Sequence, residues 1–384
     1  MPLKKLLLKP GVNRENTRYT SEGGWYECDN IRFRQGTPEK IGGWTRISDA
    51  TYLGVARSLW NWITLGSQNL IGVGTHLKFY IENGGGYNDI TPLRATTSAG
   101  DVTFGASADQ LNGAIDNNDT TIILDDTTGF PSTGKILIDS EVIDYSAISS
   151  NTLTGCTRGA SYLVAGTSTA TTAAAHSDNA TVNCFTLVVT EAGHGAKAND
   201  FVTFTDAAAL FSSGGNITAT MLNQEYQIEN IEGDNTYTIL AKSFSTDTIT
   251  DANYTNIAAN SSDSGNGGSA TVGAYQIATG ASSANPRVGW GASGWGSGAW
   301  GQGIEDTESL RIWTQQNFGE DLIFGHRGGA IYYWDATGDL TTRATALTGT
   351  DIPSIQNSIL VSDINRFVFC FGANIISSAT QDPM

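Results

Sequence analysis

Cysteine and methionine are scarce in this 384-residue chain, which has four and three of them, and lysine and leucine are sparse as well. Cys28, Cys156, Cys184 and Cys370 lie far apart, and no CxxC pair occurs. The spacing therefore excludes a zinc ribbon and implies no disulfide framework, so we expect reduced, partly buried thiols. The shortage of strong helix formers argues against a helical fold.

Long apolar runs are also missing. The opening "MPLKKLLLKPG" has only three leucines before Lys9, which is too short for the apolar core of a signal peptide. No run reaches the roughly 18 apolar residues of a membrane span. We expect a soluble chain, made in a cytoplasm, that inserts no segment into a membrane.

Catalytic motifs are absent too. The four histidines show no metal-ligand spacing, and no GxSxG, HExxH or P-loop occurs. The carboxylates around Asp116 and Asp126 lack the loop pattern of a calcium site and are interpreted as solvated turns. We therefore predict no enzyme, no cofactor and no metal site, although a glycosidase with paired carboxylates stays a third hypothesis.

Residues that form strands and turns are abundant instead. Glycine numbers 45, and threonine, serine, asparagine and aspartate are plentiful. Hydrophobic residues make up 39% of the chain, enough for packed cores. In "IRFR", Ile31 and Phe33 alternate with Arg32 and Arg34, which predicts a half-buried strand followed by a turn at "QGTP". The composition predicts an all-β fold.

Two distant segments resemble each other and set the predicted domain organisation. Residues 51–96 contain short apolar runs of the size of one β-propeller blade, and the order returns in 306–384, with Leu70-Ile71 matching Leu322-Ile323. A third, incomplete copy begins at 355–377. We predict a β-propeller-like scaffold of short antiparallel sheets, preceded by an N-terminal arm with first strands over 1–50.

The residues between the two copies differ in character. Short strands at Ile122–Leu124, Lys135–Ile138 and Glu141–Tyr145 are separated by Gly, Pro and Ser turns. We predict two small β-sandwich or barrel modules, 97–183 and 184–280, inserted into one loop of the scaffold.

A strap of glycine and tryptophan, "RVGWGASGWGSGAWGQG", lies within residues 281–305. Trp290, Trp295 and Trp300 recur every five residues, a spacing that suits neither a helix nor a strand. We predict tight turns in which each indole docks into an apolar slot, because three bare indoles would leave a large apolar area in water.

Charge is unevenly distributed along the chain. Residues 1–50 hold nine basic and six acidic residues, and residues 97–280 hold four basic and twenty acidic ones. An acidic body repels DNA phosphates, whereas a basic arm favours contact with other copies or with an acidic partner. The candidate partner-binding residues are Lys4, Lys5, Lys9, Arg14, Arg18, Arg32 and Arg34.

The segment "KPGVNRENTRYTSEGGWYECDNIRFRQGTPEKIGGW" resembles the N-terminal signature of the tail hub or nozzle proteins of short-tailed bacteriophages, also called packaged-DNA stabilisation proteins. The strap and "NFGEDLIF…GGAIYYWD" resemble the same group. The residues that carry the signature are Pro10, Gly11, Arg14, Thr17, Arg18, Tyr19, Trp25, Tyr26, Arg32, Phe33, Gly42, Gly43 and Trp44.

The resemblance implies a β-propeller-like subunit of the virion tail. It implies six copies in a ring around a channel, contacts with the adaptor and portal rings and with tail fibres, and DNA that is retained and then passed at ejection without specific binding. An alternative hypothesis is a carbohydrate-binding tail-fibre or adhesin protein, with the tryptophans as sugar platforms.

Overall fold

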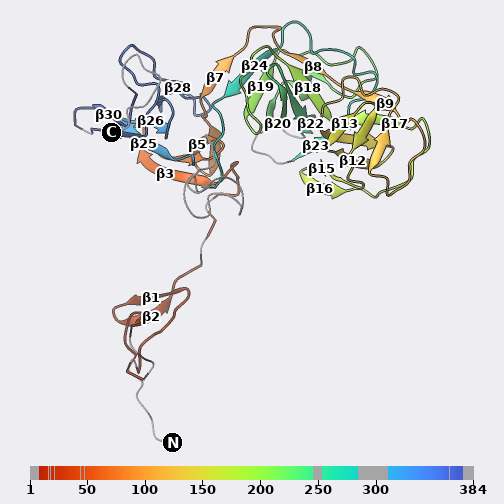
Figure 1. Cartoon of the computed structure of the whole chain (residues 1–384). Coiled ribbons are helices and arrows are strands. Elements are labelled where there is room, and N and C mark those ends of the chain that lie inside the picture. The colour runs from red at the N-terminus through yellow and green to blue at the C-terminus, as the bar shows by residue number, and fades with distance from the viewer. Residues whose placement is uncertain are drawn as a thin grey trace, which may run out of the picture. The chain divides into compact units, whose positions relative to one another are not determined.

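The computed structural model describes residues 8–15, 17, 19–20, 22–43, 45–46, 48–244, 253–283, 310–362 and 364–374 (Figure 1). The chain divides into two compact units, Met1–Asp49 and Ala50–Met384. Apart from the one-turn helix α1 (Ala219–Leu222), the regular elements of the described residues are strands, and they form several small antiparallel sheets. The predicted all-β class is confirmed.

The N-terminal unit contains one hairpin, β1 (Ile31–Arg34) paired with β2 (Thr37–Lys40). Ile31 and Phe33 are half-buried and the two arginines between and after them are exposed, as the alternation predicts. The turn residues Gln35 and Gly36 have φ angles of 50° and 81°, which suit the tight turn of a two-residue hairpin.

The first copy of the repeat forms a four-stranded sheet in chain order. Its strands are β3 (Ala56–Ile63), β4 (Asn69–Thr75), β5 (Phe79–Asn83) and β6 (Gly86–Asp89). Gly74 has no room for a side chain, since a Cβ there would lie 2.5 Å from Cδ1 of Trp313 in the second copy. The glycine thus permits close approach of the two sheets.

The second copy forms a matching four-stranded sheet, and a hairpin follows it. The strands are β25 (Trp313–Phe318), β26 (Asp321–His326), β27 (Tyr332–Trp334) and β28 (Thr345–Ala346), then β29 (Ser358–Val361) and β30 (Val368–Phe371). Leu70 and Leu322 occupy the second position of the second strand in each copy, and both are fully buried. The prediction that both segments fold into the same kind of sheet is confirmed.

The two sheets share one apolar core. The ring of Phe79 stacks on Phe324 with centroids 4.0 Å apart and packs edge-on against Trp313 at 5.1 Å. Trp62 and Trp334 complete this aromatic core. On the far side of β25, the backbone N–H of Ile359 in β29 donates to Oγ1 of Thr314. The first strands of the three units, β3, β25 and β29, therefore follow one another in space.

The inserted region begins and ends on neighbouring strands of a seven-stranded sheet. In spatial order the strands are β7 (Leu93–Thr96), β24 (Val272–Gln276), β19 (Phe201–Thr205), β20 (Glu225–Gly233), β21 (Thr236–Leu240), β18 (Thr186–Thr190) and β8 (Thr103–Gly105). Phe104 of β8 contacts Phe204 of β19 at 4.9 Å, although three strands separate them in this order. The sheet is therefore strongly curved around its core.

A second core lies in the preceding part of the insertion. Its buried residues come mainly from a four-stranded and a three-stranded sheet. Two further hairpins, one before and one after residue 184, form separate two-stranded sheets. The strands are β12 (Glu141–Tyr145), β11 (Gly134–Ile138), β17 (Thr181–Cys184) and β9 (Ala108–Gln110); β10 (Thr121–Ile123), β14 (Thr152–Thr154) and β13 (Ala147–Ser149); β15 (Ser161–Val164) and β16 (Thr167–Ala170); and β22 (Lys242–Phe244) and β23 (Tyr254–Asn256).

These strands agree with the three that the sequence predicts between 122 and 145, to within one residue. Strand β8 falls inside the predicted first module, yet it pairs with β18 of the second. The module boundaries otherwise stay a prediction.

A buried ion-pair network joins the repeat sheets to the seven-stranded sheet. Nζ of the fully buried Lys78 lies 2.7 Å from Oδ2 of Asp89 and also contacts Glu225 of β20. Arg343 of the second copy reaches Asp89 and Glu225 at 3.3 and 3.4 Å. Burial raises the pKa of Asp89, but Lys78 and Arg343 outweigh burial and hold that pKa at about 2.

Candidate assembly surfaces

The described residues of the N-terminal unit form no core of their own. Among its described residues none is buried, and its main packing contact is the edge-on pair of Trp25 and Phe33, with centroids 5.9 Å apart. Tyr19 is almost fully exposed, and Tyr26 and Ile41 are largely exposed. A segment with so little buried apolar area gains most of its stability from whatever it packs against, so it is a candidate docking arm.

The basic residues of this arm differ in their surroundings. Arg14 lies 3.7 Å from Glu27 and stacks over the ring of Tyr26, and Arg32 pairs with Glu39 across the hairpin. Arg34 shares the exposed face of β1 with Arg32, and Lys9 is exposed. The predicted residues Lys4, Lys5 and Arg18 lie outside the described residues.

The larger unit exposes apolar side chains along the first strands of its repeat. Leu59 and Ile63 on β3 are 67% and 66% exposed. In the third unit, Leu360 of β29 lies opposite Phe369 of β30, and both are exposed together with Phe371. We call these five residues the apolar edge.

Three residues of the apolar edge, from two of these units, lie in the same groove. Leu59, Leu360 and Phe371 line one groove of about 400 Å³, whose floor is formed by β25. The opposite face of the β29–β30 hairpin packs its own apolar residues, such as Ile359 and Val361, against the second copy. A hairpin that is apolar on both faces is typical of an internal layer, so the exposed face suits another sheet or another chain.

The buried carboxylate of Glu141 is surrounded by structural partners. Glu141 accepts hydrogen bonds from Arg158 and from the backbone N–H groups of Gly159 and Ala174, and His176 Nε2 lies 2.8 Å from it. Burial raises the pKa of Glu141, but these hydrogen bonds outweigh burial and hold that pKa at about 2. A buried carboxylate saturated in this way is a poor acid or base.

Three of the histidines have structural surroundings. Nδ1 of His194 accepts from the N–H of Ala196 at 3.0 Å, and Nδ1 of His76 accepts from the N–H of Val55 at 2.9 Å. Burial, helped by Arg311, lowers the pKa of His326 to about 3. Each of the three is held by backbone or packing contacts.

No group of three or more His, Cys, Asp and Glu side chains is arranged to hold a metal within the part of the chain that the structure describes. The described residues also contain no helix long and apolar enough to cross a membrane. Trp290, Trp295 and Trp300 lie outside the described residues, while the flanking residues Ala281 and Leu310 form a parallel bridge.

The sequence reasoning missed two features, the apolar edge and the buried network. The network could have been suspected from Lys78, a single cation inside the apolar run "LKFYI". The edge could have been suspected from "RFVFCF", in which both faces of a short strand are apolar.

Comparisons with known proteins give little. No protein-family model matches the chain, and no curated protein matches its sequence. Among solved structures, a phage phi92 endosialidase is similar over 83% of this chain and 43% of its own length, with 10% identity and a TM-score of 0.15. The chain thus spans less than half of that protein, and a likeness this slight supports no assignment of family or function.

Proposed function

We propose that this chain is a structural subunit of a bacteriophage tail, a ring-forming hub or nozzle protein that retains packaged DNA and passes it at ejection. In this subunit the sheets are arranged like the blades of a propeller, with β3, β25 and β29 as successive first strands. The proposed subunit has no catalytic role, cofactor or metal. The ring has six copies, as in the family that the N-terminal signature resembles, and it meets portal-side ring proteins and tail fibres in the virion.

The apolar edge is the observation that carries this proposal. Its large apolar side chains are exposed to water on the larger unit, although that unit has well-packed cores. Such exposure is expected for a surface that another copy covers. The arm supports the same conclusion because its described residues form short elements and none of them is buried. Both features fit a subunit that is completed by its neighbours.

Charge distribution supports the DNA-passing role. The four basic and twenty acidic residues of 97–280 give that region a net charge of −16. A channel wall of this sign offers DNA phosphates no attachment, so a duplex is free to slide. The arm, with a net charge of +3 over residues 1–50, suits contact with acidic neighbours.

The test is the assembled mass in solution, measured by light scattering after size-exclusion chromatography. We expect the 40.6 kDa chain to form a discrete oligomer. The double variant Leu59→Ser, Phe371→Ser removes two side chains that line the groove and should shift the mass to that of a monomer. Leu93→Ser, Ile123→Ser is the matched control, because both residues are exposed apolar positions outside the edge.

Two results contradict the proposal. One is a monomeric wild-type chain at micromolar concentration, and the other is an oligomer that the groove variant leaves intact. Circular dichroism of each variant shows whether the β fold is retained.

A further inference from the structure

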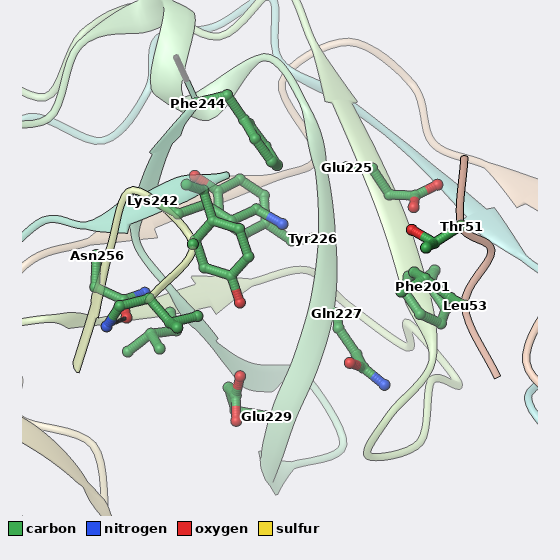
Figure 2. A pocket seen from close by; sticks show the side chains of 14 residues that line it. Thr51, Leu53, Phe201, Glu225, Tyr226, Gln227, Glu229, Lys242, Phe244 and Asn256 are labelled. Atoms are coloured by element: carbon green, nitrogen blue, oxygen red, sulfur yellow. Dashed lines mark hydrogen bonds between the residues drawn. The ribbon is translucent and has the colours of Figure 1, made fainter. Parts of the chain in front are cut away.

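A cavity of about 310 Å³ lies beside β20 in the inserted region, apart from the apolar edge (Figure 2). The residues that line it include Tyr226 on β20, Lys242 and Phe244 on β22, and Tyr254 and Asn256 on β23. This size is at the lower end of small-molecule sites and suits a ligand of one ring.

Three aromatic rings surround a cation in this cavity. Nζ of Lys242 lies 4.8 Å from the ring centre of Tyr226, 5.0 Å from that of Phe244 and 5.4 Å from that of Tyr254. Among the described residues this Nζ makes no hydrogen bond or ion pair. Burial lowers the pKa of Lys242 to about 8, so the ammonium has lost water without gaining a direct acceptor.

A second donor in the cavity also has no acceptor. The side chain of Asn256 is 4% exposed, and its Oδ1 accepts a hydrogen bond from the N–H of Leu163 at 2.9 Å. This bond fixes the orientation of the amide, and Nδ2 then has no partner among the described residues. A buried amide N–H without an acceptor is unusual in a folded protein, and a bound ligand would satisfy it.

Glu229 is the carboxylate that balances the charge of Lys242, because Glu225 is already paired with Lys78 and Arg343. Burial raises the pKa of Glu229, and the nearby ammonium of Lys242 partly offsets that rise. The cavity therefore offers one ammonium and one carboxylate. An anionic ligand would meet Glu229, a cationic one would meet Lys242, and a purely apolar one would leave Nδ2 of Asn256 unpaired.

We propose that this cavity binds one unit of a neutral saccharide. The C–H face of a sugar ring packs on aromatic rings such as Tyr254, its hydroxyl oxygens accept from Asn256 and Lys242, and a hydroxyl group donates to Glu229. The inference stands on the cavity alone and does not depend on the proposed role in tail assembly.

The experiment is isothermal titration calorimetry of the full chain with D-glucose, D-galactose and N-acetyl-D-glucosamine, each used separately. We expect at least one to bind with a Kd of about 1 mM. Glucuronate and glucosamine, which add a negative and a positive charge, should each bind at least about tenfold more weakly than the matching neutral sugar.

Two variants connect binding to the cavity. Asn256→Asp keeps the acceptor for Leu163 and removes the unpaired donor, and Lys242→Met keeps the aliphatic stem and removes the ammonium. Each should weaken binding about tenfold, whereas Arg327→Met, at an exposed position outside the cavity, should leave it unchanged. Thermal unfolding checks that each variant is folded. If Asn256→Asp does not fold, Lys242→Met still tests the proposal.

Three results overturn the inference: no neutral sugar binds, only glucuronate binds, or binding is unaffected by the folded variants. None of them bears on the oligomeric mass, so failure here is distinguishable from failure of the proposed function.

Discussion

Replacing Lys78 by methionine should destabilise the larger unit strongly. The side chain is fully buried, and its ammonium contacts Asp89 and Glu225 from two different sheets. With Arg343, the four groups sum to zero charge. Methionine keeps most of the aliphatic volume, so the substitution removes the charge and leaves a net negative cluster out of water.

The expected magnitude follows from the remaining partner. Removing one member of a buried ion pair costs about 3–5 kcal/mol because it leaves an uncompensated charge. Arg343 still reaches both carboxylates at 3.3 and 3.4 Å, so we expect the lower end, about 3 kcal/mol. Adding Glu225→Gln to Lys78→Met restores neutrality and should recover part of that loss.

The assay is urea unfolding followed by tryptophan fluorescence. Residues 97–283 contain no tryptophan, so the signal comes from the arm, the strap and the repeat sheets, where Trp62, Trp313 and Trp334 are buried. Arg327→Met is the exposed control and should change the free energy of unfolding by less than about 0.5 kcal/mol. A cost below about 1 kcal/mol for Lys78→Met, or a double variant less stable than the single one, would refute the reasoning.

Three further outcomes follow from the same structure. The folded-state pKa of about 2 for both Asp89 and Glu141 lies below their ordinary values of 3.8 and 4.5, so their stabilisation is present above about pH 4.5 and is lost as pH falls toward 2; unfolding titrations between pH 6 and 2 should show this decline, and a flat profile would contradict it. Phe79→Ala empties the space between the two repeat sheets and should cost about 3–5 kcal/mol in the urea assay, with a cost under about 1 kcal/mol arguing against a shared core. Burial raises the pKa of Cys184 to about 12 and that of Cys156 to about 11, so both thiols should react with a disulfide reagent at pH 8 only after unfolding; fast modification of either in the native chain, located by peptide mass, would show that the packing is wrong.

Local pattern predicted much of the strand content. The alternation of Ile31 and Phe33 with two arginines and the run Glu141–Tyr145 both identify strands that the structure contains. The repeat was visible because Leu70 and Leu322 occupy the same position of a similar segment. These signals are local, and periodicity is enough to read them.

Long-range pairing was not predictable in the same way. Lys78 and Glu225 are 147 positions apart, and nothing near either residue specifies the other. The pairing of β8 with β18 and the unpartnered amide of Asn256 likewise depend on how distant strands are brought together. Such features are set by tertiary packing, so composition and spacing cannot reveal them.

Electron cryomicroscopy of the assembled chain tests the central claim most directly. The account predicts a closed ring with rotational symmetry, six-fold by the resemblance, in which the apolar edge of one copy is covered by its neighbour and acidic residues line an open channel. Isolated single chains with the apolar edge in solvent, or an assembly without a channel, would contradict it.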